Sequence, residues 1–345
     1  MTTISVAMAT YNGGRFIREQ LDSIAAQTLL PTELVITDDG SDDNTIAIIT
    51  EFSQTAPFPV RLHRNQQRLG YRTNFMKAAC LCGAPLIAFC DQDDVWYPEK
   101  LETVSNIIMK DDDCLLLQHG FRLIDGSGRL ISDTINNPDF QGGQPWSRAL
   151  GLTQIFKKPL LAFSHLRKLS IDHNRPQEEM AHDQWIYFLA HMLKGNRIIM
   201  TPLLNYRQHD NNVCGFKTGG GEINNFEILY NLSKGNAESF GKKRSVLKES
   251  IEGVAAGAYG RVRVIEAMRL ESTGIDQTCL GLRLAEYDQF HTYASSRAKI
   301  YAQTERRKRA WYFMMVLLNG FYFRNGIRGV KDSIIDLIYG VSRNE

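Results

Sequence analysis

Residues 86–94 have the sequence LIAFCDQDD, in which five apolar residues are followed by three carboxylates within four positions. A short apolar run bounded by polar residues is typical of a buried strand. Three acids at the end of such a strand raise one another's proton affinity, so we expect a cation to hold them together. Oxygen ligands suit a hard ion, and the stretch therefore predicts a strand that ends at a Mg²⁺ or Mn²⁺ site. The alternative is a capping cluster ahead of a helix that starts near Pro98.

Three more strands are predicted before this one, at residues 4–9, 34–37 and 60–63, with helical patterns between them. Parallel strands need crossover connections, so this alternation favours a mainly parallel sheet flanked by helices. Ligands of such sheets bind beyond the carboxyl ends of the strands. The predicted fold class is therefore α/β and Rossmann-like, with the ligand site at that edge of the sheet.

The chain of 345 residues divides into two regions by charge and by pattern. Residues 1–150 carry 12 basic and 19 acidic side chains, a net charge of −7, whereas the remainder carries 28 and 19, a net charge of +9. An acidic region can hold a metal, and a basic region can meet phosphate. Periodicity is mostly helical after the run Gly219-Gly220-Gly221. We predict a ligand-binding domain over residues 1–218 and a C-terminal helical region over residues 222–345.

Polar residues follow the first two predicted strands, as Thr10, Tyr11 and Asn12 after the first and as Asp38 and Asp39 after the second. Neighbouring parallel strands bring such ends together. A carboxylate there can accept hydrogen bonds from a base or a ribose, and the tyrosine ring can stack on a base. The alternative for either cluster alone is a polar turn with a helix cap.

Two later clusters carry further candidates. Asp183 precedes an apolar helical pattern and can serve as a general base, or equally as a helix N-cap. Arg207 can bind a diphosphate through several N–H donors, and His209 can supply a hydrogen-bond donor or a metal ligand. Alternatively, both residues lie on the surface. We expect diphosphate or acceptor contacts from the following residues: Asp94, Trp96, Trp185, Arg207 and His209.

The longest uncharged stretch, residues 310–323, is shorter than the about 18 to 20 apolar residues that span a bilayer. A basic run at residues 306–309 precedes it, and six aromatic residues lie within it. This composition fits a segment at an anionic membrane surface and equally a helix packed on the main domain. No signal peptide is indicated at the N-terminus. We expect a cytoplasmic protein, peripheral on the cytoplasmic face of the inner membrane under the first alternative.

The clusters together resemble glycosyltransferases of family two, and within them a bacterial branch that includes cell-surface rhamnosyltransferases. Similar motifs occur in the same order over residues 4 to 215. They are V-A-M-A-T-Y-N-G, Q-T-L-L-P-T-E-L-V-I-T-D-D-G-S-D-D-N-T, F-C-D-Q-D-D-V-W-Y-P-E-K-L, H-D-Q-W and Y-R-Q-H-D-N-N-V. One departure is Leu152, which replaces a smaller residue of the segment that lines the acceptor site in that branch.

The resemblance implies a GT-A fold and a set of roles. Asp91 and Asp93 would form the D-x-D motif that binds Mg²⁺ or Mn²⁺ and the diphosphate, and Asp183 would be the catalytic base. Nucleotide binding would fall to Thr10, Tyr11, Asn12, Asp38, Asp39 and Asp91.

The implied activity is an inverting, metal-dependent transfer of a sugar from a nucleotide diphosphate donor to a glycan or lipid-linked glycan acceptor in cell-surface polysaccharide synthesis. The favoured donor is dTDP-L-rhamnose, and a UDP-hexose is the alternative. A non-catalytic protein that binds sugar nucleotides or glycans on the same fold is a further alternative. So is a nucleotidyltransferase, whose glycine-rich loop residues 10–15 match only loosely.

Overall fold

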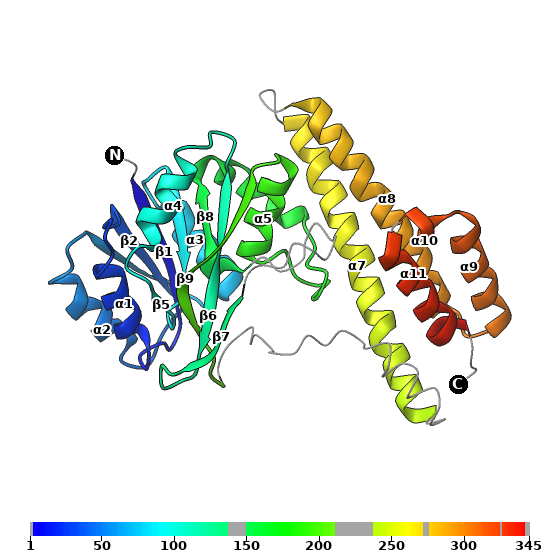
Figure 1. The fold of residues 1–345 in the computed structure, drawn as a ribbon, viewed down its shortest axis with the longest axis horizontal. Helices are drawn as coiled ribbons and strands as arrows, with labels where there is room; N and C mark the ends of the chain where they lie inside the picture. The colour runs from blue at the N-terminus through cyan, green and yellow to red at the C-terminus, as the bar shows by residue number, and fades with distance from the viewer. Residues whose placement is uncertain (1–2, 137–149, 211–236, 272–275, 325, 342–345) are drawn as a thin grey trace. The chain divides into compact units, whose positions relative to one another are not determined.

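The computed structural model describes residues 3–136, 150–210, 237–271, 276–324 and 326–341 (Figure 1). The chain forms two compact units. One comprises Met1–His165 with Ala181–Phe216, and the other comprises Leu166–Met180 with Lys217–Glu345. The glycine run expected at the domain boundary lies outside the described residues, so the predicted domain limits stay predictions.

The N-terminal half of the sheet is parallel. Its strands are β1 (Ile4–Thr10), β2 (Glu33–Asp38), β3 (Val60–Arg64) and β4 (Leu86–Cys90), in the order β3-β2-β1-β4. Every residue of β1, β2 and β4 is buried, as expected for parallel strands covered on both faces. The connecting helices are α1 (Ile17–Ala25), α2 (Thr45–Ser53) and α3 (Tyr71–Leu81).

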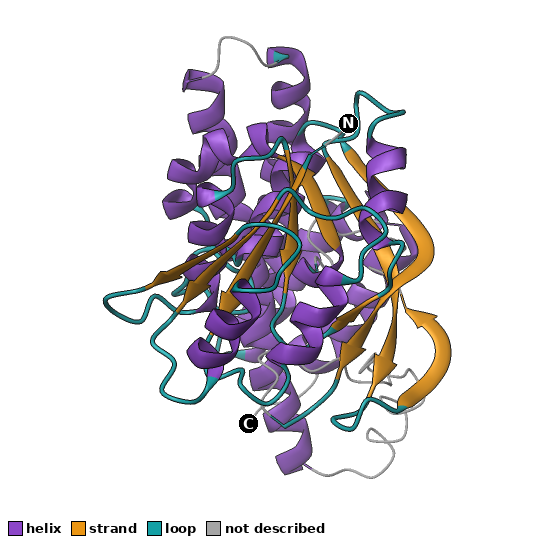
Figure 2. Ribbon diagram, turned by 90° about the vertical axis from the view of Figure 1, so that its left-hand side faces the viewer, coloured by secondary structure: helices purple, strands orange, loops and turns teal. Residues whose placement is uncertain are grey.

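Beyond β4 the sheet is mixed (Figure 2). It continues through β8 (Gln154–Lys157), β6 (Leu116–Ile124), β9 (Asn196–Arg207) and β5 (Val95–Trp96), and β7 (Leu130–Asn136) pairs with β6. Four of the eight strand pairs within the described residues are antiparallel: the hairpin β6-β7, and the pairs β4-β8, β6-β8 and β5-β9, whose strands are distant along the chain. The predicted α/β class is confirmed, while the parallel arrangement is limited to β3-β2-β1-β4 and to the pair β6-β9.

Three helices and a single turn connect the later strands of the sheet. Helix α4 (Lys100–Ile108) follows β5, and the single turn η1 (Gly151–Thr153) leads into β8. Helix α5 (His182–Met192) precedes β9, and the irregular helix η2 (Lys158–Leu169) runs from the first unit into the second. The start of α5 and the turn η1 are thereby placed beside the strand ends that carry the predicted acids.

The second unit is helical, as predicted for the C-terminal region. Helices α7 (Ala237–Glu271) and α8 (Gln277–Ala302) lie side by side, followed by α9 (Arg306–Leu318), α10 (Phe321–Arg324), α11 (Gly326–Ile335) and η3 (Asp336–Val341) (Figure 1). The uncharged stretch at 310–323 is not one helix, because α9 ends before Gly320, which has φ +69°. A glycine in that conformation commonly ends a helix. No helix within the described residues is long and apolar enough to cross a membrane.

A buried polar cluster anchors the C-terminal segment to α8. The Asp336 carboxylate is fully buried and accepts hydrogen bonds from the Arg297 guanidinium at 2.7 and 2.9 Å. The hydroxyl groups of Tyr301 and Tyr322 also donate to it, at 2.9 and 2.7 Å. Every oxygen of this carboxylate is therefore paired, and η3 is tied to the unit's core.

Candidate active site

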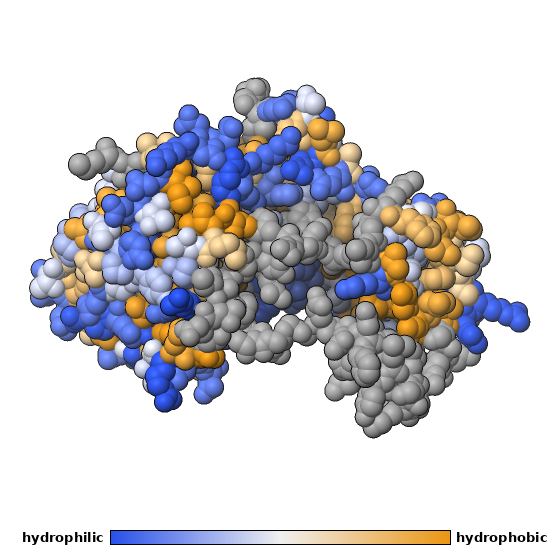
Figure 3. All heavy atoms as spheres, in the orientation of Figure 1, coloured by the Kyte–Doolittle hydropathy of each residue, from blue (hydrophilic) through white to orange (hydrophobic). Residues whose placement is uncertain are grey.

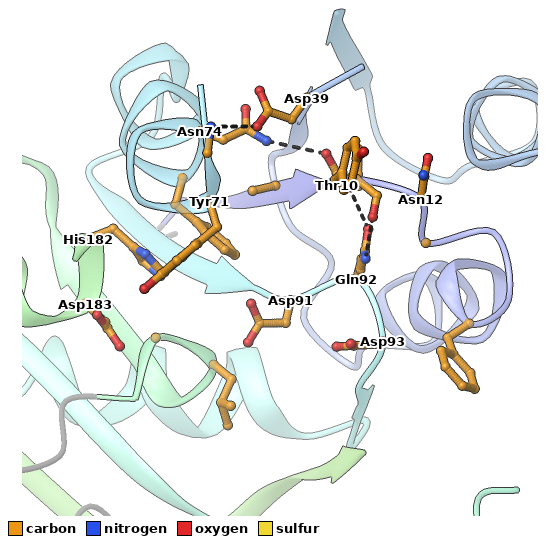
Figure 4. A pocket seen from close by; sticks show the side chains of 18 of the residues that line it. Thr10, Asn12, Asp39, Tyr71, Asn74, Asp91, Gln92, Asp93, His182 and Asp183 are labelled. Carbon is orange, nitrogen blue, oxygen red and sulfur yellow. Dashed lines mark hydrogen bonds between the residues drawn. The ribbon is translucent and has the colours of Figure 1, made fainter. Parts of the chain in front are cut away.

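A cavity of about 610 Å³ opens at the carboxyl ends of β1 and β4, within the first unit (Figure 4). Eight of the thirteen residues predicted from the sequence line it: Thr10, Tyr11, Asn12, Asp39, Asp91, Asp93, Asp183 and His209. Lining residues that sequence reasoning missed include Arg15, Arg68, Tyr71, Asn74, Phe75, Gln92, Gly151 and His182.

Asp38 lies behind the cavity wall rather than on it. Its carboxylate is fully buried and accepts from the Thr10 hydroxyl at 2.8 Å and from the N–H groups of Gly40 and Ser41 at 3.1 and 2.9 Å. The structure thus gives Asp38 a supporting position, and its predicted nucleotide contact stays a prediction. The carboxylate fixes the turn after β2 and the orientation of Thr10.

Asp39 lines the cavity and organises the loop that leads into α3. Its carboxylate accepts from the N–H groups of Leu69 and Gly70 at 2.6 and 2.8 Å, and from the Asn65 amide at 3.0 Å. The same loop carries Arg68, whose guanidinium carbon lies 3.9 Å from the centre of the Tyr11 ring. The tyrosine predicted for base stacking thus already has a cation over its ring. No pattern in the sequence indicated this pairing.

Gln92 is a second residue that sequence reasoning missed. Its side-chain amide accepts from the N–H of Tyr11 at 3.0 Å and donates to the carbonyl of Tyr11 at 3.1 Å (Figure 4). A Cβ on Gly13 would lie 2.3 Å from the Gln92 amide oxygen, so a larger residue there would displace the Gln92 side chain. Gln92, the residue between Asp91 and Asp93, thereby joins the end of β4 to the loop after β1.

The acidic cluster divides between the cavity and the interior. Asp91 and Asp93 face the cavity, and an Asp93 oxygen lies 2.9 Å from the His209 Nε2. Asp94 is fully buried, does not line the cavity and accepts from the backbone N–H of Arg207 at 3.1 Å; its predicted ligand contact stays a prediction. Burial, followed by the charges of Asp93 and Asp183, raises the pKa of Asp91 to about 8.

These donors fit a hard divalent cation. Two carboxylates and an imidazole converge on one cavity, and a cation there would favour the ionised form of Asp91. Within the described residues, no group of three His, Cys, Asp or Glu side chains is already arranged as a metal site. Mg²⁺ usually takes only one or two carboxylates and completes its shell with phosphate and water. The donor set therefore suits an ion that binds together with a diphosphate.

Asp183 occupies the second position of α5 and faces the same cavity as Asp91 (Figure 4). It is not the N-cap, which is Ala181. Burial raises the pKa of Asp183 to about 6, although hydrogen bonds from the backbone N–H groups of Gln184 and Gly151 oppose the shift. A carboxyl group with this pKa is mostly ionised at neutral pH and is still basic enough to accept a proton.

The neighbour of this carboxylate, His182, is held by aromatic rings. Its imidazole stacks on Phe75 with centroids 4.0 Å apart and meets Phe89 edge-on at 4.8 Å. A Cβ on Gly151 would lie 2.6 Å from the His182 Nε2. The turn η1 is therefore in close contact with His182 and Asp183.

A buried lysine connects the acids to η1. Lys100 is fully buried, and its Nζ donates to the Leu152 carbonyl at 3.0 Å and lies 3.7 Å from the Trp96 ring centre. Burial lowers the pKa of Lys100 to about 7, and the nearby charges of Cys90, Asp94 and Asp91 oppose this shift. Leu152 itself lines the cavity, so the acceptor-side departure seen in the sequence is part of the pocket wall.

Three remaining candidates do not line the cavity. Arg207 is buried, and its guanidinium donates to the Asp93 carbonyl at 2.8 Å and pairs with Glu19 at 2.5 Å. Trp96 and Trp185 are buried in the core of the unit. These side chains face protein groups within the described residues, and their predicted diphosphate or acceptor contacts stay predictions.

Comparisons with known proteins identify relatives of this chain among glycosyltransferases. Residues 5–157 match the family model described as Glycosyl transferase family 2. Over 221 residues the chain is 30% identical to dTDP-rhamnosyl transferase RfbG of Shigella flexneri, covering 60% of this chain and 73% of that protein. Over 109 residues it is 31% identical to UDP-Glc:alpha-D-GlcNAc-diphosphoundecaprenol beta-1,3-glucosyltransferase WfgD of Escherichia coli, covering 32% and 42%.

One solved structure extends the likeness to the fold. The crystal structure of S. aureus TarS 1-349 in complex with UDP aligns with a TM-score of 0.52 at 15% identity, covering 87% of this chain and 80% of that one. At this identity the likeness concerns the fold alone.

Proposed function

The chain belongs to glycosyl transferase family 2, and from this premise we propose that it is an inverting glycosyltransferase that builds a cell-surface polysaccharide. One observation carries the proposal. A carboxylate with a pKa near neutrality, Asp183, faces the same cavity as the two carboxylates Asp91 and Asp93. A base and a cation-binding pair around one space are what transfer from a nucleotide diphosphate sugar requires.

Asp183 acts as the general base in this proposal. The acceptor hydroxyl oxygen forms a bond to the anomeric carbon while the bond from that carbon to the diphosphate breaks. The acceptor proton passes to Asp183, and the bonding electron pair leaves with the nucleoside diphosphate. A single displacement of this kind inverts the anomeric centre. Gly151 holds the base in place through its backbone N–H.

The residues that would hold Mg²⁺ or Mn²⁺ are Asp91 and Asp93, with His209 beside them. When bound, the ion would neutralise charge that builds up on the departing diphosphate. Tyr11 and Arg68 form the nucleoside end of the cavity in this proposal, since they present a ring and a cation there.

We propose dTDP-L-rhamnose as the donor, which the name of the S. flexneri relative supports. A UDP-hexose is the alternative, supported by the name of the E. coli relative. The name of the latter also supports a lipid-linked glycan as the acceptor, and we place the protein at the cytoplasmic face of the inner membrane, where such an acceptor would be anchored.

The test is binding and turnover of a panel of nucleotide sugars by the purified protein, with Mg²⁺, with Mn²⁺ and with EDTA. We expect metal-dependent selection of dTDP-L-rhamnose. Selection of a UDP-hexose would change the proposed donor sugar and would still support the proposed transferase activity. If no nucleotide sugar binds with or without metal, the non-catalytic alternative is favoured.

Two variants test the assigned roles. Asp183→Asn should keep donor binding and lose about 10²- to 10⁴-fold in turnover, the usual contribution of a general base. Asp93→Ala should weaken the metal-dependent part of nucleotide binding itself. The matched control is Asp113→Asn, which changes an exposed carboxylate outside the cavity. Turnover retained by Asp183→Asn would remove that residue from the base role.

A further inference from the structure

Helix α9 presents an apolar stripe to solvent. Trp311, Met314, Met315 and Leu318 follow the spacing i, i+3, i+4, i+7, which places them on one face of the helix, and they are between 40% and 75% exposed. The buried residues of α9 are Arg309 and Val316. A surface helix normally turns its apolar stripe toward the core. Here the stripe faces outward.

The exposed apolar surface continues on the following helices. Val330, Ile334 and Leu337 are spaced by four and three residues and are each about half exposed, and Phe323 on α10 is 69% exposed. Figure 3 shows apolar side chains gathered over this part of the second unit. Single exposed apolar residues are ordinary, but a gathering of this size marks an interaction surface.

Cations accompany the stripe. Arg306 and Arg307 are exposed at the start of α9 and line a shallow hollow, and Lys331 is exposed on α11 beside Val330. Two of the four basic residues at 306–309 already contact other protein groups. Lys308 pairs with Glu305 at 2.7 Å, and the Arg309 side chain is buried and donates to the Thr304 carbonyl.

We propose that the docking face, defined as the α9 stripe with Arg306 and Arg307, binds the surface of an anionic lipid bilayer. A helix of 13 residues is about 20 Å long, too short to span the hydrocarbon layer, and lies in the plane of the interface. The apolar stripe enters the headgroup region, and the arginines meet lipid phosphates. Anionic lipid is favoured over a second copy of this chain, because the exposed arginines at the start of the stripe are complementary in charge to lipid phosphates.

Flotation of the full-length protein with vesicles tests this inference. We expect binding to vesicles of phosphatidylglycerol and phosphatidylethanolamine. Binding to pure phosphatidylcholine vesicles should be about 30-fold weaker, since about 1 kcal/mol is lost for each of the two arginines. Trp311→Glu combined with Leu318→Glu should reduce partitioning at least about tenfold. Arg306→Glu combined with Arg307→Glu should remove the preference for anionic lipid and its dependence on salt.

The matched control is Leu282→Glu, which introduces the same charge at a 64% exposed leucine on α8. Point substitutions are preferable to truncation before Arg306, because Val316, Tyr322 and Tyr339 belong to the core of the second unit. Nucleotide binding by each variant, in solution, separates this inference from the proposed catalytic function.

Two outcomes would overturn the inference. One is a failure of the lipid test itself: the wild-type protein binds no vesicle, or Leu282→Glu loses as much vesicle binding as the variants of the docking face. The other is concentration-dependent self-association that Leu318→Glu abolishes, without vesicle binding, which would assign the face to a second copy of the chain.

Discussion

Gly151→Ala is the substitution that tests the close packing of the site most directly. The backbone of Gly151 is outside the left-handed region, so alanine is acceptable there on conformational grounds. Space is the obstacle. The added Cβ would lie 2.6 Å from the His182 Nε2 and 3.5 Å from the Asp183 Cβ.

The size of the effect follows from these distances. Ordinary van der Waals contact begins at about 3.4 Å, so the carbon and the imidazole must separate by roughly 0.8 Å. His182 has little room to retreat, since its ring stacks on Phe75 at 4.0 Å. Either η1 or the start of α5 must therefore move, and both contribute to the position of Asp183.

We expect turnover of Gly151→Ala to fall by about 10- to 100-fold, because a displacement of about 1 Å in a reacting group can cost about 10²-fold. The free energy of unfolding should fall by about 1–3 kcal/mol, the usual cost of overpacking. Donor affinity should change little, because the nucleoside end at Tyr11 and Asp39 is built by other elements.

The assays are steady-state transfer, calorimetric donor binding and urea unfolding. Gly281→Ala is the matched control, since no atom lies within 4 Å of its added Cβ and the residue is inside helix α8. It should gain about 0.5–1 kcal/mol of stability with unchanged turnover. Wild-type turnover and stability in Gly151→Ala would refute the packing argument.

Further predictions concern pH and two buried charges. Because Asp183 has a pKa raised to about 6 and must be ionised to accept a proton, kcat/KM should fall about tenfold per pH unit below that value and level off above it. A profile that is flat from about pH 5 to 7 would contradict the base assignment. Lys100→Met should cost about 1–3 kcal/mol in urea unfolding, because it leaves the Leu152 carbonyl without its donor; a change below about 0.5 kcal/mol would disprove that. Asp336→Asn should cost about 1.5–3 kcal/mol, because it removes a charge-assisted pair with the buried Arg297, which keeps its second carboxylate partner, Asp332, at 2.6 Å; an unchanged thermal midpoint would show that the pair with Asp336 is not needed.

The sequence determined the N-terminal half of the fold and much of the site. Strands β1, β2 and β4 are short apolar runs, a signal that depends on neighbouring residues alone. Polar residues that directly follow buried parallel strands must lie at one edge of the sheet. For that reason Thr10 and Asp91 could be placed on the cavity before the structure was known.

Side-chain direction was decided only by the tertiary structure. Arg207 looked suited to a diphosphate, but pairing of β9 with β5 and β6 turns it toward Glu19 and the Asp93 carbonyl. Arg68 carried no signal in the sequence, and it reaches the cavity because Asp39 folds the loop before α3. Both outcomes depend on residues that are distant along the chain.

In the C-terminal region, too, the sequence determined one part of the structure and tertiary packing determined the other. The aromatic and basic residues near residue 311 indicated either a segment at a membrane surface or a buried helix, and no local pattern distinguishes the two. The structure turns Val316 inward and Trp311 outward, because Tyr322 and the Asp336 cluster fill the core of the unit. Periodicity determines which residues share a helical face, whereas the direction of that face depends on what the rest of the chain packs against it.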